Sequence, residues 1–230
     1  MEVKRLKFTL LNHLFYYTEI AGRAASATGG FIGDLALNYA LRNSLRLNKE
    51  QQEFRRKPYY EEIREFGFYC TIAKPLMGSP IKRTENYIRN TLFNVDGYPD
   101  VKAIEKSGKS PFKNFRQVQG ITVGSTFTAV LFSQHPLDIP TTIRIGTGKE
   151  TLVLVEEIPI EEKLKEEEYW LNAFSLKVIF NHLDEAVQLL LKSGTCNFNF
   201  VLEQYNLIKK VSLADATSIF KPFFDQPPHH

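Results

Sequence analysis

The sequence lacks the features of several protein classes. Only two cysteines occur in 230 residues, Cys70 and Cys196, and they form no CxxC pair. Neither a disulfide framework nor a zinc site is therefore indicated. No uncharged apolar run approaches the roughly 18 residues that a membrane span needs, and the first residues lack the apolar stretch of a secretory signal. We therefore expect a cytoplasmic protein that has no membrane contact.

Catalytic and cofactor motifs are also missing. The histidines ahead of the C-terminal tail, His13, His135 and His182, stand outside the HxxxH, HxE and GxSxG patterns. A structural or surface role is favoured for each, and we expect no catalytic residue, no metal and no cofactor. His13 leaves one alternative open, because a histidine near a first strand could act as acid or base in RNA cleavage. That alternative is a metal-independent endoribonuclease.

The chain does have the apolar material of a folded domain. It is 43% hydrophobic, 13% aromatic and 24% charged, with a net charge of only +3. The charges are unevenly distributed: basic residues gather in 42–57 and 102–116, and glutamates gather in 156–168. This distribution predicts a positive surface and a separate acidic surface, which is either solvated or repels nucleic acid.

The order of the expected elements predicts an α+β fold with a mostly antiparallel sheet. Two helices are expected, one over 35–45 with Asp34 as its N-cap and one over 182–193. A strand-helix-strand unit that occurs twice fits a ferredoxin-like or RNA-recognition core. Strands or β-like runs are expected at 7–13, 66–73, 117–132, 143–145, 151–158, 173–180 and 207–211.

The sequence predicts a single domain over residues 1–226, followed by a tail at 227–230. The last two histidines, His229 and His230, resemble the start of a purification tag. Residues 74–116 have poor periodicity and frequent turn residues, which is typical of a functional segment inside a compact domain. We interpret this stretch as a long arm-like insertion.

Three groups of residues suggest contact with phosphates. The turn Gly146-Thr147-Gly148-Lys149 is no Walker loop, but its glycines let backbone N–H groups approach an anion beside Arg144. The helix over 35–45 carries a polar stripe at helical spacing after a glycine-rich entry. The expected arm interleaves basic residues with Phe112 and Phe115. Together these groups are typical of a surface that binds single-stranded RNA.

The segment 29–41, GGFIGDLALNYAL, resembles the N-terminal region of the Cas-five capping subunit (Csc-one type) of subtype I-D CRISPR effector complexes. The later Thr142-Ile143-Arg144-Ile145-Gly146 is similar to that family's Ile-Arg-x-Gly turn, which precedes a valine-rich strand. Here residues 151–155 supply such a strand. In the family a lysine directly follows the glycine of the turn, whereas Thr147 and Gly148 precede Lys149 here.

The resemblance implies a RAMP-type core in a non-catalytic subunit that caps the 5′ handle of the guide RNA and supports interference with target DNA. Its partners would be the handle, the Cas-seven type backbone subunit and the large subunit, with target DNA near the handle end as a further candidate. We expect these residues to converge on one trough for RNA: Arg23, Asn38, Tyr39, Arg42, Arg46, Lys109, Lys113, Arg116, Arg144, Gly146 and Lys149. With this resemblance, the endoribonuclease alternative becomes a metal-independent enzyme that processes precursor guide RNA. A protein-interaction module with a basic face remains a second alternative.

Overall fold

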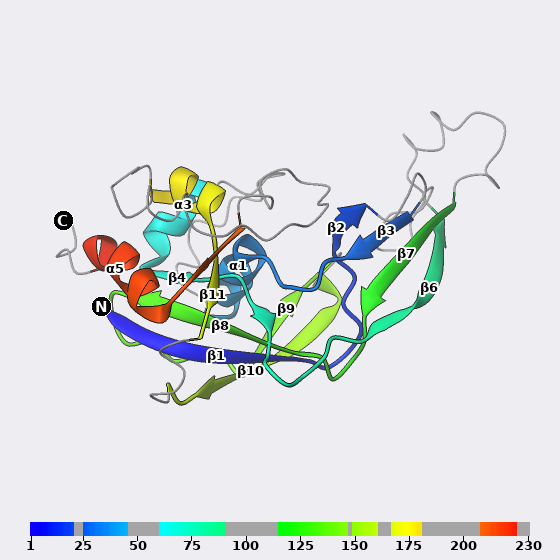
Figure 1. Cartoon of the computed structure of the whole chain (residues 1–230), viewed down its shortest axis with the longest axis horizontal. Helices are drawn as coiled ribbons and strands as arrows, with labels where there is room; N and C mark the ends of the chain where they lie inside the picture. The colour runs from blue at the N-terminus through cyan, green and yellow to red at the C-terminus, as the bar shows by residue number, and fades with distance from the viewer. Residues whose placement is uncertain are drawn as a thin grey trace.

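Two sheets lie end to end along the long axis of the molecule, and the helices gather at the end that holds both termini (Figure 1). The computed structural model describes residues 1–20, 25–45, 60–90, 115–146, 149–160, 167–180 and 208–224. Among these residues, no helix combines the length and the apolar character that crossing a membrane requires.

The main sheet is antiparallel throughout, in the order β4-β8-β1-β10-β9, with β5 paired to β8 as well. Its central strand β1 is Glu2–Leu10. The other strands are β4 (Phe68–Cys70), β5 (Lys74–Pro75), β8 (Thr126–Ser133), β9 (Thr142–Ile145) and β10 (Thr151–Ile158). The prediction of an α+β fold with a mostly antiparallel sheet is confirmed.

The first half of the main sheet has the connectivity of a split βαβ unit. The chain runs from β1 through helix α1 (Asp34–Leu45) to β4, and β8 lies between these two parallel strands. The 3-10 helix η2 (Tyr60–Phe66) precedes β4. This is the first half of a ferredoxin-like core, and β10 takes the place of its fourth strand. Between β8 and β10 the described residues form strand β9 rather than a second helix, and the helix expected over 182–193 lies outside the described residues.

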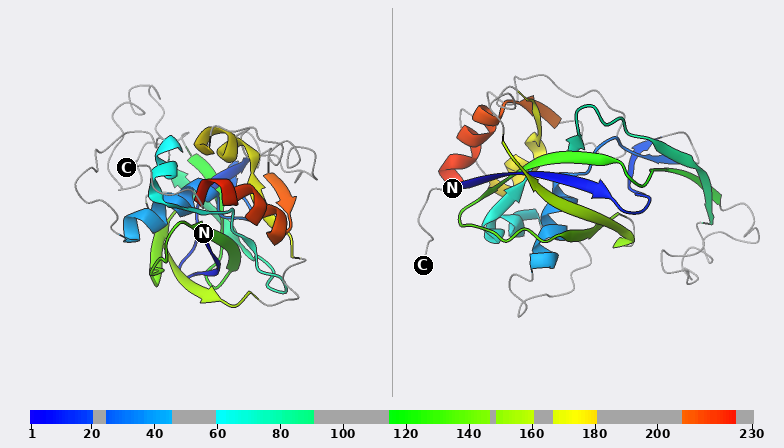
Figure 2. Two further views of the ribbon diagram at one scale, coloured as in Figure 1. Left: turned by 90° about the vertical axis from the view of Figure 1, so that its left-hand side faces the viewer. Right: turned by 90° about the horizontal axis from the view of Figure 1, so that it is seen from below.

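The main sheet curls around α1. The helix contacts both edge strands, β4 and β9, and the end-on view in Figure 2 shows the strands wrapped into an open barrel. Alternate residues of β1, Leu6, Phe8 and Leu10, enter one core with Leu37 and Leu41 of the helix. This alternation is the period of two that a half-buried strand requires.

The convex face of the same sheet is covered in part by later elements. Helix α5 (Leu213–Phe224) stacks Phe220 on Phe132 of β8 at 4.5 Å between ring centroids. Strands β11 (Tyr169–Asn172) and β12 (Ile208–Val211) pair beside it, and helix α3 (Ala173–Phe180) follows β11. The sequence did not predict α5, although Ser212 and Asp215 form its N-terminal cap through a 3.1 Å bond from the Asp215 N–H to the Ser212 hydroxyl.

The prediction of a β-like run at 173–180 is wrong, because these residues form α3. Asn172 accepts a hydrogen bond from the Phe174 N–H through its side-chain oxygen, at 3.1 Å. This bond satisfies one of the amide groups that a helix N-terminus leaves without an internal partner. The β-branched and aromatic composition of the run suits a strand, but the cap and the buried position of Leu176 and Ile179 select a helix.

The second sheet has the order β2-β3-β7-β6 and extends away from the first (Figures 1 and 2). Its strands are β2 (Tyr17–Ile20), β3 (Ala25–Thr28), β6 (Arg83–Asn90) and β7 (Phe115–Ile121). Strands β6 and β7 pair antiparallel, with Asn90 opposite Phe115 at the far end. The insertion expected over 74–116 contains β6 and only the first two residues of β7, while residues 91–114 lie outside the described residues.

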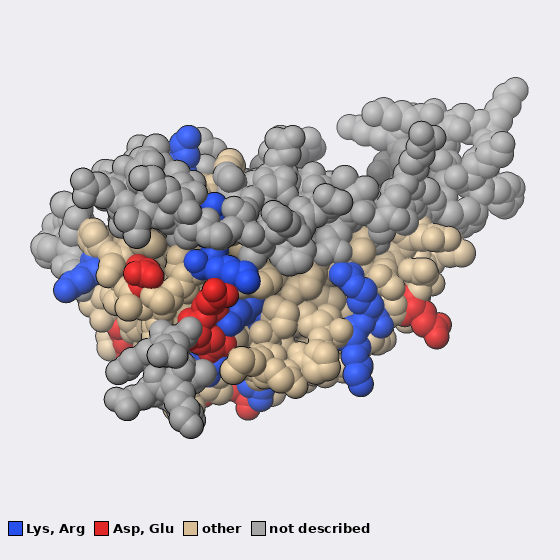
Figure 3. All heavy atoms as spheres, viewed as in Figure 1, with Lys and Arg blue, Asp and Glu red and all other residues tan. Residues whose placement is uncertain are grey.

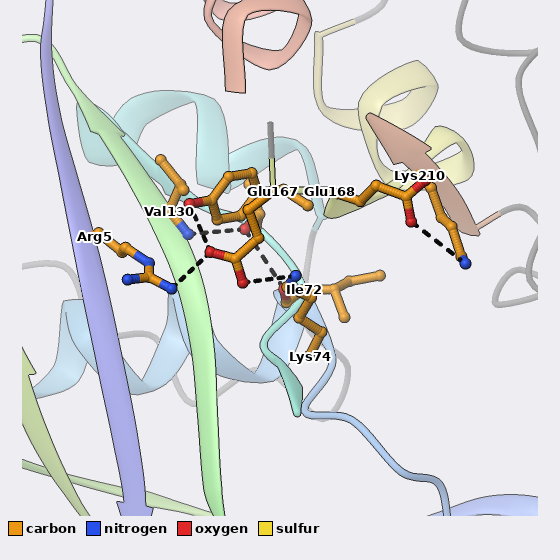
Figure 4. Close-up of polar contacts among 9 residues, drawn as sticks. Arg5, Ile72, Lys74, Val130, Glu167, Glu168 and Lys210 are labelled. Carbon is orange, nitrogen blue, oxygen red and sulfur yellow. Dashed lines mark hydrogen bonds and ion pairs between the residues drawn. The ribbon is translucent and has the colours of Figure 1, made fainter. Parts of the chain in front are cut away.

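A buried carboxylate fastens β11 to the main sheet (Figure 4). Glu167 contacts the guanidinium of Arg5 on β1 at 2.6 Å and the ammonium of Lys74 on β5 at 2.8 Å. The side chains of Arg5 and Glu167 are only 7% and 6% exposed. Burial, together with the charge of Glu167, raises the pKa of Tyr169 to about 12. In this cluster the Glu167 carboxylate lies between two cations at a site with little access to water.

The described glutamates of 156–168 do not form a separate acidic surface. Glu156 pairs with Lys7 at 2.9 Å and Glu157 with Lys4 at 3.1 Å, both across the β1–β10 pairing. Glu168 pairs with Lys210 at 3.4 Å. The register of the strands places these acids opposite cations, which a count of charges along the chain cannot reveal.

Replacing Glu167 by alanine is expected to lower the free energy of unfolding by about 3 kcal/mol or more, because two cations then stay buried without their partner. Chemical denaturation at neutral pH measures this loss. Glu157→Ala removes the more exposed pair with Lys4 and should cost less than about 1 kcal/mol. Equal effects of the two substitutions would contradict a dominant role for the buried cluster.

Candidate nucleic-acid interface

The two sheets meet at residues 11–16, which we call the junction segment. Leu14 exchanges two backbone hydrogen bonds with Ile121 at the end of β7, each 2.9 Å. The carbonyl of His13 accepts a hydrogen bond from the hydroxyl of Thr151 on β10 at 2.9 Å. Asn12 holds the backbone of Leu152 and Glu150 through its side-chain amide, at 2.7 and 2.9 Å. The junction segment is therefore held by β7 on one side and by β10 on the other, through hydrogen bonds to backbone groups.

Two glycines let other backbone come close to the junction segment. A Cβ on Gly120 of β7 would lie 2.5 Å from the carbonyl oxygen of Leu14 and 2.8 Å from the ring of Phe15. A Cβ on Gly146 would lie 3.1 Å from Leu14, and this glycine has a φ of 81° in the left-handed region. The ring of Phe15 consequently lies directly on the β7 backbone, and the turn after β9 lies against the junction segment.

An aromatic cluster of His13, Phe15 and Tyr87 occupies this junction. The Phe15 ring meets the Tyr87 ring of β6 edge to face, at 5.5 Å and 90°. His13 lies 6.5 Å from the same tyrosine, and its Nδ1 accepts a hydrogen bond of 3.3 Å from the Val123 N–H. Tyr87 is 44% exposed, so one side of the cluster faces solvent.

Three exposed cations lie on the turns and strand ends that contact the junction. Lys82 precedes β6, and its carbonyl accepts a hydrogen bond from the Thr122 N–H at 2.9 Å, next to the Val123 that binds His13. Arg144 and Lys149 flank the β9–β10 turn. Figure 3 shows a band of blue side chains where the main sheet meets the β6–β7 strand pair. No ion pair joins these three side chains to another described residue. The junction therefore combines positive charge with exposed aromatic surface.

The predicted residues of α1 lie elsewhere. Asn38 is fully buried, and its side chain bonds the N–H of Cys70 at 2.8 Å and the carbonyl of Cys70 at 2.9 Å. Tyr39 packs edge to face on Phe66 at 5.5 Å. Arg42 pairs with Glu62 at 3.4 Å and covers the Phe66 ring at 4.6 Å. Asn38 and Tyr39 therefore hold α1 against β4 and η2, and only Arg42 of these three carries charge to a surface.

Arg42 and Arg144 do not converge on one trough as expected. Strand β9 buries Ile143 and Ile145 in the core with α1, so its alternation turns Arg144 to the convex face, away from the helix. Gly146 and Lys149 do come together, because the Lys149 N–H bonds the Gly146 carbonyl at 3.1 Å across the turn. Lys149 itself has a φ of 56°, which is uncommon for a residue other than glycine.

The remaining predicted residues cannot be placed. Arg23, Arg46, Lys109 and Lys113 lie outside the described residues. The backbone of Arg116 lies on β7 opposite Arg89 of β6, with its side chain outside the description. Their contact with RNA stays a prediction.

Sequence reasoning missed Phe15 and Tyr87 and gave His13 only a minor role. Tyr87 belongs to the poorly patterned stretch 74–116, where no period marks which side a residue faces. One signal was present: Gly120 inside a strand indicates a close approach of another group, here the ring of Phe15.

Comparison with known proteins decides the family. A family model described as type I-D CRISPR-associated protein Cas5/Csc1 matches residues 1–221. The chain belongs to the type I-D Cas5/Csc1 family. This confirms the resemblance drawn from the segment 29–41 and the turn at Gly146. No curated protein matches the chain.

Three solved structures to which this family member is similar come from other CRISPR systems. A chain of the type III-B Cmr-beta complex bound to cognate target RNA and AMPPnP gives a TM-score of 0.41 at 10% identity, over 69% of this chain and 64% of that one. The present chain thus spans less than two thirds of that relative. A chain of a type IV-B CRISPR complex gives 0.34 at 7% identity, over 69% and 91%. Cmr4 (Cas7) of Pyrococcus furiosus gives 0.31 at 12% identity, over 68% and 100%.

Gly120→Ala is expected to destabilise this Cas5/Csc1 member by about 2 kcal/mol, because the new methyl group overlaps the Leu14 carbonyl and the Phe15 ring. Thermal or chemical denaturation measures the effect. Gly30→Ala is the matched control, since its Cβ would meet only Ile81, at 4.0 Å, and should change stability by less than about 0.5 kcal/mol. A fully stable Gly120→Ala protein would show that the junction segment tolerates displacement.

Asp34 should make stability depend on pH. Burial raises the pKa of this carboxyl above 3.8, although Tyr69 donates a hydrogen bond to it at 2.6 Å. The folded state then binds the proton more tightly than the unfolded state, so this group destabilises the fold as pH rises above about 4. The free energy of unfolding of Asp34→Asn, relative to wild type, should increase with pH and level off once Asp34 is ionised in the folded state.

Denaturation curves between pH 3 and pH 8 measure this difference. Asp138→Asn, which removes a carboxylate from an exposed loop, controls for the change in net charge. A difference between Asp34→Asn and wild type that is constant over this range would refute the effect of burial on Asp34.

Proposed function

We propose that this subunit binds the 5′ handle of the guide RNA in a type I-D effector complex, and that the junction between its sheets is the main contact surface. The observation that carries the proposal is that Lys82, Arg144 and Lys149 lie on turns and strand ends that contact the junction, which also holds the aromatic cluster of His13, Phe15 and Tyr87. Cations hold the phosphates of single-stranded RNA and aromatic rings hold its unpaired bases.

Membership of the Cas5/Csc1 family supports a role inside a ribonucleoprotein. The capping role would place this subunit at the end of the filament of Cas-seven type backbone subunits, where it also docks the large subunit near target DNA. The β6–β7 strand pair extends from the junction and suits an arm that separates handle from spacer. Sequence specificity would then come from guide pairing, while this chain contacts backbone and handle.

Arg42 lies away from the junction and is a candidate for a second contact. Its guanidinium already has Glu62 and the Phe66 ring as neighbours, so it would contact RNA at the cost of these interactions. Asn38 is excluded from the proposed surface because its amide is buried and hydrogen-bonded. The proposed surface therefore keeps Arg144, Gly146 and Lys149 of the predicted set and adds Lys82 and the aromatic cluster.

The double substitution Arg144→Ala and Lys149→Ala is expected to weaken binding of guide RNA and to make it less dependent on salt. Each lost phosphate contact lowers the slope of log affinity against log salt concentration by about 0.7 for a single strand, so two contacts lower it by about 1.4. Fluorescence anisotropy with labelled guide RNA over a salt series measures the slope.

The matched control is Lys177→Ala with Lys221→Ala, which removes the same charge from exposed positions on α3 and α5. These helices lie at the other end of the molecule (Figure 1). An unchanged slope for the first pair, or an equal change for both pairs, would reject the junction as the phosphate contact.

We also propose that the subunit does not cleave RNA. The Nδ1 of His13 is occupied by the Val123 N–H, and no described carboxylate contacts the ring. Incubation of the purified chain with repeat RNA in the presence of a chelator should leave the RNA intact. Specific cleavage that His13→Ala abolishes would instead establish the endoribonuclease alternative.

A further inference from the structure

Tyr87 is an exposed aromatic residue that the fold does not need for its core. It lies on β6 at the edge of the second sheet and is 44% exposed, although tyrosine usually buries more of its ring. Its neighbour Ile88, on the opposite face of the strand, is 67% exposed. Exposed apolar surface of this kind often marks a contact with another molecule.

The ring of Tyr87 rests on a rigid base. Phe15 supports it edge to face at 5.5 Å, and Phe15 lies on the backbone of β7 because Gly120 has no side chain. A ring that is already fixed loses little conformational entropy when a partner stacks on it. Ile88 has no such aromatic support among the described residues.

His13 adds a hydrogen-bond donor beside the ring. Its Nδ1 accepts the Val123 N–H at 3.3 Å, so the neutral imidazole carries its proton on Nε2. No described residue accepts a hydrogen bond from Nε2. This N–H is therefore available to a ligand that stacks on Tyr87, whose ring centroid is 6.5 Å from that of the histidine.

The charge around the ring selects among possible ligands. Lys82, Arg144 and Lys149 lie on the turns and strand ends that hold the junction, and two carboxylates, Glu85 and Glu150, are also exposed there. Arg83 at the start of β6 adds a fourth cation, so these elements carry four described cations and two described carboxylates, which suits a phosphate-bearing ligand better than an apolar peptide. A flat, uncharged ring next to cations is the arrangement that holds an unpaired base and its phosphate.

We propose that Tyr87 stacks on one unpaired base of the guide RNA handle, with the His13 Nε2–H as a donor to that nucleotide. This inference rests on the proposed function, and it names the contact that a base, rather than a phosphate, makes with the junction. The stack is insensitive to the identity of the base, because every base offers a π face.

The test uses guide RNAs that carry the fluorescent base 2-aminopurine at one handle position at a time, bound to the full chain. One position should be quenched by the wild type and by Tyr87→Phe, which keeps the ring, but not by Tyr87→Ala. Tyr87→Ala should lower the affinity about 10-fold, and the slope against salt should stay unchanged because no phosphate contact is lost.

Ile88→Ala is the matched control, since it removes an exposed apolar side chain from the other face of β6 and should change neither quenching nor affinity. Thermal denaturation confirms that each variant is folded. Stacking is refuted if the fluorescence at every handle position is the same with Tyr87→Ala as with wild type. If Arg144→Ala with Lys149→Ala still weakens binding in that case, the proposed function stands. If neither set of substitutions affects RNA binding, both fail.

A protein contact would give a different result. If Tyr87→Ala leaves RNA binding intact but lowers retention of the chain in the assembled effector complex, the exposed ring contacts a neighbouring subunit and the stacking proposal is overturned.

Discussion

Three stretches of backbone approach one another closely at the junction, and this contact determines how the two sheets are oriented. Leu14 pairs with Ile121, Phe15 lies on Gly120, and the turn at Gly146 packs against both junction residues. Glycine is needed at two of these contacts, because a Cβ would lie 2.5 Å from the Leu14 carbonyl oxygen at Gly120, and 3.1 Å from the Leu14 side chain at Gly146, whose φ of 81° also favours glycine. Since the junction joins the two sheets, the orientation of the β6–β7 strand pair relative to the curled main sheet depends on the same atoms that support Tyr87.

The buried charges on the convex face of the main sheet form a separate cluster. Glu167 draws Arg5 and Lys74 from two strands of the main sheet to the start of β11. Such a cluster contributes less net stability than its short distances suggest, because each ion loses its hydration. Its consequence is geometric: a shifted position of β11 would leave a buried charge unpaired, so β11 has one favourable position against the main sheet.

The sequence predicts the periodic parts of this fold well and the junction poorly. The helix over 35–45 and the strand over 151–158 were predicted almost to the residue, because apolar residues recur at helical spacing in one and valines and leucines alternate in the other. The expected N-cap is wrong, because Asp34 is the first residue of α1 and its carboxylate accepts a hydrogen bond from Tyr69. The helix α3 was missed because its cap, Asn172, is a single residue before a run of strand-like composition. Tyr87 and Phe15 could not be paired from the sequence, since they are 72 residues apart in the chain and meet through a tertiary contact that no local period encodes.

The separation of Arg42 from Arg144 changes how the RNA-binding surface should be understood. A trough lined by α1 and the β9–β10 turn would hold RNA on the concave side of the main sheet, but that side is filled by the core around α1. Arg144 faces the convex side, and Lys149 extends from the turn next to the junction. A single stack on Tyr87 discriminates weakly among bases, so selectivity for a handle must come from where the chain places phosphates relative to that ring. The glycine contacts fix the distance between the β9–β10 turn and β6. This distance can set where the chain holds phosphates relative to the ring of Tyr87.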